Sequence, residues 1–126
     1  MENWLSRTEL LLGKEKLEKL RSAKVLIVGL GGVGSYAAEM ICRAGIGNMT
    51  IVDGDRIHTS NRNRQLLALT STEGKQKTGL MAERLSDINP VLNIIVINEY
   101  IRDDRMIEVL ESGYDYVVDA IDTLSP

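Results

Sequence analysis

A hydrophobic segment that breaks into a glycine-rich turn is the feature that most constrains the fold of this chain. Residues 24–34 read KVLIVGLGGVG, and a stretch with helical spacing follows. Gly29 permits a tight turn, while Gly31 and Gly32 let a ligand approach the backbone without a Cβ in the way. Gly34 allows the next helix to pack closely on the strand. The turn therefore predicts a phosphate site at a helix N-terminus, where N–H groups and the helix dipole favour an anion.

Strands and helices alternate along the sequence. We expect helices over residues 8–20, 33–43, 75–88 and 103–110, and strands over residues 25–28, 49–52, 92–97 and 114–118. Strands that are apolar on both faces and separated by helices predict an α/β fold of the Rossmann-like, doubly wound kind, with a mainly parallel sheet and helices on both faces. The first helix is amphipathic and precedes the sheet. Asp103 is expected to cap the last helix.

Composition narrows the class of protein. The 126 residues are 44% hydrophobic and 26% charged, as in a soluble globular protein. We expect an N-terminal helical segment over 1–22 and a nucleotide-binding domain over 23–126. The sequence ends just after the fourth strand, so the sheet would be incomplete at its C-terminal side and the chain an N-terminal fragment of a longer protein.

Charge and cysteine content exclude several functions. The formal net charge of −3 provides no overall attraction to nucleic acid or to an anionic membrane. No apolar run is long enough to span a membrane and no signal peptide is recognisable, so we expect a cytoplasmic protein. Cys42 is the sole cysteine, which excludes a disulfide framework and favours a buried apolar role for this side chain.

Acidic residues follow two of the expected strands. Asp53 and Asp55 come directly after the second strand, and Asp119 and Asp122 end the fourth. Ligands of open parallel sheets bind outside the carboxyl ends of the strands. Asp53 lies about twenty residues after the glycine turn, where a carboxylate accepts hydrogen bonds from ribose hydroxyls. Asp55 either contacts the ligand or orients the following loop. NAD and ATP fit these features equally well.

Polar and cationic residues then favour a triphosphate over a dinucleotide. They are Ser60, Asn61, Asn63, Arg64 and Gln65, with Lys77 further along the chain. Arg64 can make bidentate contacts with phosphate oxygens, whereas Lys77 supplies a point charge. Asp122 is a candidate ligand for Mg²⁺, which is commonly bound through a carboxylate together with water and phosphate oxygens.

Taken in order, these motifs resemble those of the ThiF/MoeB/HesA superfamily, which is related to ubiquitin-activating enzymes. The motifs are the glycine turn, Asp53-x-Asp55, the SNRNRQ segment at residues 60–65, Gly74-x-x-Lys77 and Asp119-x-x-Asp122. The resemblance implies ATP-dependent adenylylation of a carboxylate with release of pyrophosphate, with ATP and Mg²⁺ as cofactors.

The resemblance also implies a role for individual residues. Gly32 would lie along the phosphates, Asp53 would hold the ribose, Arg64 and Lys77 would stabilise phosphate charge, and Asp122 would serve Mg-ATP. Arg7 matches an arginine that the superfamily supplies from a partner subunit, which implies a homodimer with Arg7 acting in trans.

Within the superfamily, the chain is most similar to the tRNA threonylcarbamoyladenosine dehydratases. The segment at residues 7–20, the NRNRQ form at residues 61–65 and the DAID ending at residues 119–122 carry this similarity. That branch activates the threonylcarbamoyl carboxylate of a modified adenosine in tRNA, and ring closure then expels AMP with net loss of water.

One alternative is an enzyme that activates the C-terminus of a ubiquitin-like sulfur carrier, with sulfur-carrier or sulfur-relay proteins as partners. Another is a non-catalytic module that binds a nucleotide such as NAD.

Overall fold

The computed structural model describes residues 3–121. The elements along the chain are α1 (Ser6–Leu12), α2 (Lys14–Ser22), β1 (Lys24–Val28), α3 (Gly34–Ala44), β2 (Asn48–Val52), the 3₁₀ turns η1 (Thr59–Asn63) and η2 (Thr70–Thr72), α4 (Lys77–Ile88), β3 (Asn93–Ile97), α5 (Asp103–Leu110) and β4 (Tyr116–Asp119). Within the described part of the chain, every helix is too short or too polar to cross a membrane.

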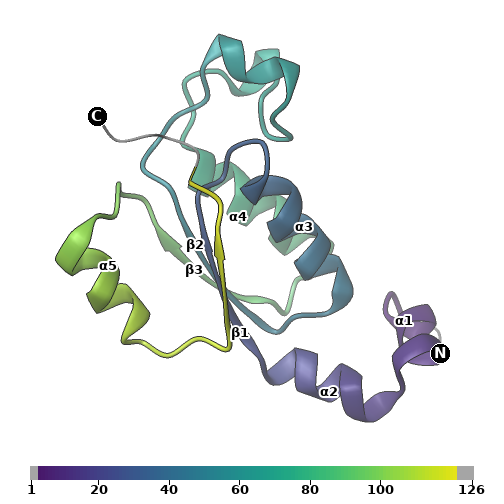
Figure 1. The fold of residues 1–126 in the computed structure, drawn as a ribbon. Coiled ribbons are helices and arrows are strands. Elements are labelled where there is room, and N and C mark those ends of the chain that lie inside the picture. The colour runs from purple at the N-terminus through teal and green to yellow at the C-terminus, as the bar shows by residue number, and fades with distance from the viewer. Residues whose placement is uncertain (1–2, 122–126) are drawn as a thin grey trace.

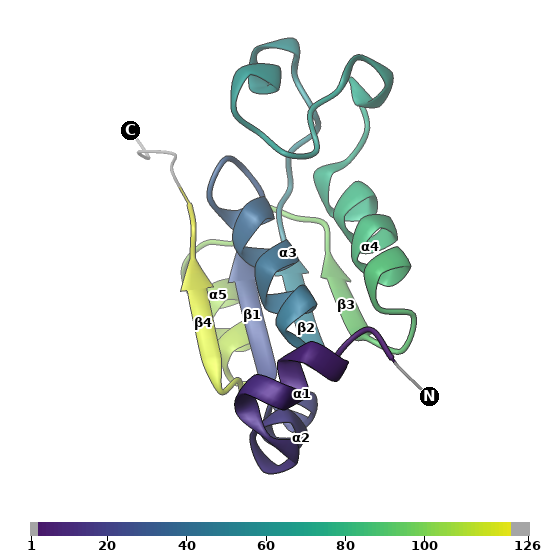
Figure 2. The same ribbon diagram turned by 90° about the vertical axis from the view of Figure 1, so that its right-hand side faces the viewer.

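The four strands form one parallel sheet in the order β3-β2-β1-β4. Helices α3 and α4 cover one face of the sheet, and α5 covers the other (Figures 1 and 2). This arrangement confirms the predicted α/β fold with helices on both faces. The register pairs Val28 with both Val52 and Asp119, and Val52 with Ile97. All four strands therefore end at the same edge of the sheet, where a ligand site was predicted.

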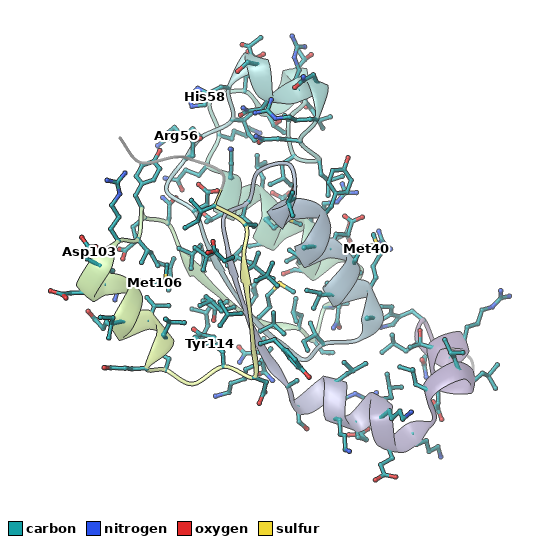
Figure 3. All side chains as sticks on the ribbon, in the orientation of Figure 1. Met40, Arg56, His58, Asp103, Met106 and Tyr114 are labelled. Carbon is teal, nitrogen blue, oxygen red and sulfur yellow. The ribbon has the colours of Figure 1, made fainter. Side chains whose placement is uncertain are left out.

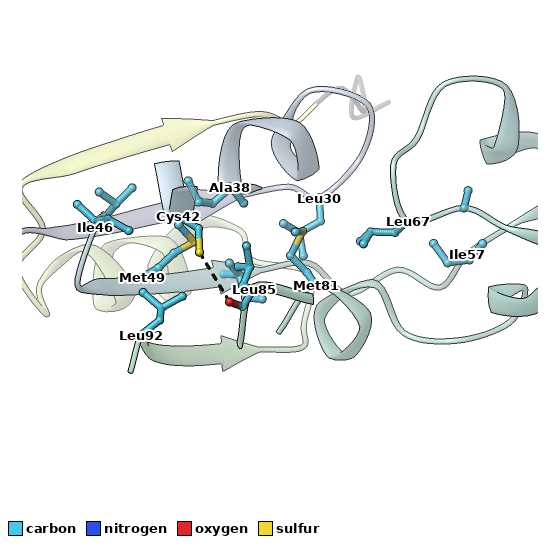
Figure 4. Packing of buried hydrophobic residues seen from close by; sticks show 14 residues of the cluster. Leu30, Ala38, Cys42, Ile46, Met49, Ile57, Leu67, Met81, Leu85 and Leu92 are labelled. Atoms are coloured by element: carbon cyan, nitrogen blue, oxygen red, sulfur yellow. Dashed lines mark hydrogen bonds between the residues drawn. The ribbon is translucent and has the colours of Figure 1, made fainter. Parts of the chain in front are cut away.

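The larger of two apolar clusters lies between the sheet and helices α3 and α4. Figure 4 shows Cys42 inside it, close to Met49 and Leu85. The Cys42 side chain is fully buried and its thiol donates a long hydrogen bond to the Leu85 carbonyl oxygen, at 3.7 Å. Burial raises the pKa of this thiol. Cys42 is therefore a core residue, as predicted, and α5 closes a smaller cluster on the other face.

The N-terminal segment differs from the prediction of one helix over residues 8–20. The structure has two helices, α1 and α2, that meet at Gly13, whose φ is +85°. A left-handed backbone interrupts the helix although the apolar spacing continues through it. Leu5 and Leu17 are buried against the turn at Gly45, which follows α3. Both helices consequently lie near the amino ends of the strands (Figure 2).

Two other helix starts also differ from the prediction. Helix α4 begins at Lys77, because Gln76 forms an antiparallel bridge with Arg56 that keeps the preceding residues extended. Asp103 does not cap α5: Arg102 is the N-cap residue, no side chain caps the helix, and Asp103 is its first residue with φ +48°. The remaining strand and helix ends shift by one or two residues, which is the usual scatter of element boundaries.

The glycine turn is held by contacts that leave no room for side chains. A Cβ built on Gly34 would lie 1.6 Å from the carbonyl oxygen of Gly29. A Cβ on Gly29, whose φ is +98°, would lie 2.7 Å from the carbonyl oxygen of Ala120. The absence of these two Cβ atoms lets the start of α3 approach the ends of β1 and β4.

Gly34→Ala is therefore expected to lower the free energy of unfolding by about 3 kcal/mol or more, since the new methyl group overlaps backbone that cannot move aside. Gly79→Ala is the matched control, because nothing lies within 4 Å of its Cβ position in α4. That variant is expected to gain about 0.5–1 kcal/mol from lower backbone entropy in the unfolded chain. Urea unfolding of both variants measures the two effects, and equal stabilities would contradict the packing described here.

Candidate nucleotide-binding site

A cleft of about 510 Å³ opens beyond the carboxyl ends of the strands. Six of the predicted site residues line it: Gly29, Gly31, Asp53, Asp55, Gln65 and Lys77. They come from the turn after β1, from the end of β2, from the segment after η1 and from the first residue of α4. The parallel topology thus brings together residues that are far apart in the sequence.

The glycine turn presents the N-terminus of α3 at this edge of the sheet. No side chain of the described residues caps that helix, and in its first turn the Ser35 N–H donates to the Gly31 carbonyl oxygen at 3.3 Å. The Asp53 carboxylate fixes the adjoining backbone, because its Oδ2 accepts from the Leu30 N–H at 2.7 Å and its Oδ1 accepts from the Asp55 N–H at 2.8 Å. Each carboxylate oxygen has a second lone pair with which to accept from a ligand hydroxyl.

Lys77 brings a buried positive charge to the cleft. Its side chain is only 5% exposed, and its Nζ lies 3.4 Å from Asp55 Oδ2. His58 Nε2 and the Tyr100 hydroxyl also contact Asp55, at 3.0 and 3.4 Å from Oδ1. Burial opposes ionisation of Asp55, but hydrogen bonds from the Arg56 amide and His58 and the charge of Lys77 outweigh it and lower the pKa. A carboxylate that stays ionised holds the ammonium group in place.

Arg64 lies next to the glycine turn, outside the set of residues that lines the cleft. A Cβ built on Gly32 would be 3.8 Å from Arg64 Cγ. The Arg64 guanidinium donates from Nη1 to the Ser60 carbonyl oxygen at 3.1 Å and to Asn63 Oδ1 at 2.9 Å. Both acceptors are neutral, so within residues 3–121 the orientation of the guanidinium is set without a carboxylate that would cancel its charge. Arg64 therefore lies beside Gly32, whereas Lys77 lines the same cleft as Gly29 and Gly31.

Most of the other predicted residues make hydrogen bonds within the protein. Asn61 is buried, and its Oδ1 accepts from the His58 N–H at 2.8 Å, which fixes the start of η1. Ser60 and Asn63 orient Arg64. Gln65 differs from these residues, because it is 7% exposed and its Oε1 is buried without a hydrogen-bond partner among the described residues. Gln65 lines the cleft with other atoms, since this oxygen is itself covered by protein.

One predicted residue lies at the far end of the sheet from the cleft, and another lies outside the described residues. Arg7 is exposed on α1, which lies near the amino ends of the strands and thus at the opposite end of the sheet from the cleft (Figure 1). It cannot reach the cleft of its own chain. Asp122, the predicted Mg²⁺ ligand, lies outside the described residues. Within residues 3–121, no three His, Cys, Asp or Glu side chains are grouped closely enough to hold a metal ion.

Sequence reasoning missed one wall of the cleft, the segment after β3. Residues 99–103 line it, including Tyr100 and Arg102. The Tyr100 ring lies directly over Gly54, where a Cβ would be 2.7 Å from a ring carbon. Figure 3 shows Asp103 at the start of α5, on the side of the sheet away from α3 and α4. The rule that ligands bind at strand ends applied equally to the end of β3, and would have found these residues.

The fold and the cleft define a Rossmann-like nucleotide-binding protein. The chain belongs to the ThiF family, which it matches over residues 5–125.

Individual relatives are similar to the chain over nearly all of its length. It is 44% identical to the tRNA threonylcarbamoyladenosine dehydratase of Bacillus subtilis over 124 residues, which are 98% of this chain and 49% of that protein. It is 37% identical to the molybdopterin-synthase adenylyltransferase of Salmonella typhimurium, over 88% of this chain and 44% of that protein. The crystal structure of Escherichia coli tRNA N6-threonylcarbamoyladenosine dehydratase, TcdA, in complex with ATP superposes with a TM-score of 0.92 and 39% identity, over 97% of this chain and 50% of that one. The chain thus spans about half the length of these relatives.

Asp55→Asn is expected to destabilise the protein at pH 7, by about 1 kcal/mol after discounting for the partial exposure of the carboxylate. The lowered pKa sets the sign of the pH dependence: the stabilisation is present above the unfolded pKa of about 3.9 and is lost as the pH falls through the folded pKa. Urea unfolding between pH 3 and pH 7 should show the difference from wild type shrinking with acidity. The exposed Asp87 provides the control, because Asp87→Asn should produce no comparable trend.

Proposed function

We propose that this chain is the ATP-binding part of an enzyme that adenylylates a carboxylate. The carboxylate is that of the threonylcarbamoyl group on a modified adenosine in tRNA, and cyclisation with loss of water follows, as in the tRNA threonylcarbamoyladenosine dehydratases. The observation that carries the proposal is the buried Lys77 ammonium facing the same cleft as an uncapped helix N-terminus. A polyanionic ligand is what such a site would bind.

The residues of the cleft fit ATP. The glycine turn provides backbone amides for phosphate oxygens, and Lys77 and Arg64 provide two positive charges next to them. Gln65 lines the cleft, and we expect its side chain to turn the buried, unpartnered Oε1 toward a hydroxyl or amine of the nucleoside. Asp53 is our candidate for the ribose, since its free lone pairs face the cleft beside the turn that it anchors.

The role of these residues in the reaction is electrostatic. The substrate carboxylate attacks the α-phosphorus, an acyl adenylate forms, and pyrophosphate leaves. Lys77 and Arg64 stabilise the charge that develops on phosphoryl oxygens, and Asp55, Ser60 and Asn63 hold the two cations so that little reorganisation is needed. Ring closure of the activated group then releases AMP.

We propose two further parts of the site, a magnesium ion and an arginine from a second copy of the chain. Mg²⁺ would be bound by phosphate oxygens, water and Asp122, because this ion commonly keeps several waters and takes few carboxylates. Arg7 would enter the cleft of a second copy, since it lies at the far end of the sheet from its own. The active enzyme would then be a homodimer in the cytoplasm.

A second candidate is activation of the C-terminus of a ubiquitin-like sulfur carrier protein. The similarity to molybdopterin-synthase adenylyltransferases favours it, because the same nucleotide cleft would serve a different carboxylate. The higher identity to the tRNA-modifying relatives makes it the weaker of the two.

ATP and NAD distinguish adenylylation from a non-catalytic dinucleotide-binding module. We expect the full-length protein to bind Mg-ATP at least about tenfold more tightly than NAD in isothermal titration calorimetry, because Lys77 and Arg64 face additional phosphate charge. Tighter binding of NAD would refute the adenylylation proposal.

Arg64→Ala is expected to lower tRNA-dependent exchange of pyrophosphate into ATP by about 10²–10³-fold, the usual cost of removing one donor to a developing oxyanion. Arg21→Ala is the control, since Arg21 is exposed on α2 and pairs with Glu18. An unchanged exchange rate in the Arg64 variant would exclude this residue from the site.

A further inference from the structure

Charge is distributed unevenly along this acidic chain. Residues 56–76, here called the basic lobe, contain four Arg or Lys residues and a single Glu. The rest of the sequence carries the other eleven Arg or Lys residues and seventeen Asp or Glu residues. The lobe thus has a formal charge of +3 in a protein whose total is −3. Figures 1 and 2 show this segment rising above the carboxyl edge of the sheet, next to the start of α4.

The four positive side chains of the lobe are exposed, namely Arg56, Arg62, Arg64 and Lys75. Their contacts leave most of this charge in place. Arg56 Nη1 donates to the neutral carbonyl oxygen of Gly74 at 3.0 Å, and Lys75 forms no ion pair within the described residues. Arg62 Nη1 donates to Thr70 Oγ1, and Arg62 Nε lies 3.8 Å from Oε1 of Glu73, the one acidic residue of the lobe. Figure 3 shows Arg56 and His58 projecting from the same side of the lobe.

The basic lobe is held in place by buried side chains and backbone hydrogen bonds. Ile57, Leu67 and Ala68 are buried in the main apolar cluster and anchor it to the sheet. The backbones of Arg56 and Gln76 pair as an antiparallel bridge, flanked by a hydrogen bond from the Ile57 N–H to the Lys75 carbonyl oxygen at 2.9 Å. Arg56 and Lys75 therefore project from two adjacent, mutually bonded segments.

The position of the lobe connects it to the cleft. The chain passes from Asp55, which lines the cleft, directly into Arg56, and it returns from Lys75 to Lys77, which lines the cleft again. A polyanion lying on the lobe would consequently have one of its groups next to the nucleotide site. A protein partner is less well matched, because residues 56–76 contain no Trp, Tyr or Phe, the side chains that anchor most protein interfaces.

We propose that the basic lobe binds the phosphodiester backbone of the RNA whose modified nucleoside enters the cleft. This proposal rests on the proposed function, which makes a tRNA the substrate. Arg56 and Lys75 would contact phosphates, and the Ser, Thr and Asn side chains of the lobe supply the neutral donors that such contacts use. The acidic remainder of the protein would repel the RNA. The RNA would therefore bind on the lobe, next to the cleft.

The test compares two charge reversals in the full-length protein. One is the double variant R56E and K75E in the lobe, and the other is K16E and K19E on α2, where both lysines are exposed. An unmodified tRNA transcript with a fluorescent label is the probe, and anisotropy gives its affinity between 50 and 200 mM KCl. The milder pair R56Q and K75Q removes the charges without reversing them, and thermal unfolding checks that each variant is folded.

We expect the lobe variant to bind the transcript on the order of tenfold or more weakly and to reduce the slope of log affinity against log salt by about 1.5–2, since two phosphate contacts are lost. The R56Q and K75Q pair should show the same reduction in slope, and the α2 variant should bind like wild type. Mg-ATP affinity, measured by calorimetry, should not change in any of them.

Four outcomes would contradict the proposal that the basic lobe binds RNA. Equal losses in the lobe and α2 variants would indicate only overall charge, and unchanged tRNA binding in the lobe variant would place the RNA elsewhere. Normal tRNA binding with lost affinity for an acidic ubiquitin-like carrier would assign the lobe to a protein partner. If wild type binds Mg-ATP but no tRNA, the proposed substrate fails together with the lobe; if it binds both and only the lobe prediction fails, the proposed function stands.

Discussion

The close approach of three backbone segments at the glycine turn is the constraint on which the rest of the structure depends. With no Cβ on Gly29 and Gly34, the end of β1, the start of α3 and the residue after β4 come into contact. Asp53 then ties the end of β2 to the same turn through the Leu30 amide. These contacts fix the positions of the strand ends relative to the helix N-terminus, and they thereby set the shape of the cleft.

The charges in the cleft depend on the positions of these strand ends. A lysine at the first turn of a helix is normally solvated, yet Lys77 is buried and depends on Asp55 for compensation. Asp55 is in turn held by the Arg56 amide and His58, so the single segment of residues 55–58 positions the ammonium group at the start of α4. The same short stretch of chain that orients Lys77 continues into the lobe, which couples the geometry of the two regions.

Periodicity and glycine spacing were sufficient to predict the parallel α/β fold, because apolar strands and amphipathic helices have distinct repeats. They could not predict the break at Gly13, since the apolar spacing runs through it and only the backbone angle changes. The Asp103 cap was wrong for a similar reason: Asp is common both at N-caps and at positive φ, and composition does not separate the two. The grouping of Asp53, Asp55, Gln65 and Lys77 was predictable from parallel topology. The same rule, applied to the end of β3, would have added Tyr100 and its neighbours.

The unpartnered Oε1 of Gln65 has a consequence for the stability of the segment that follows η1. A buried acceptor without a donor costs about 1–3 kcal/mol, and the described residues supply no donor for this oxygen. An apolar residue of similar size at position 65 would remove that cost, so the glutamine keeps this part of the fold below its achievable stability. Packing alone therefore does not explain the choice of residue at this position.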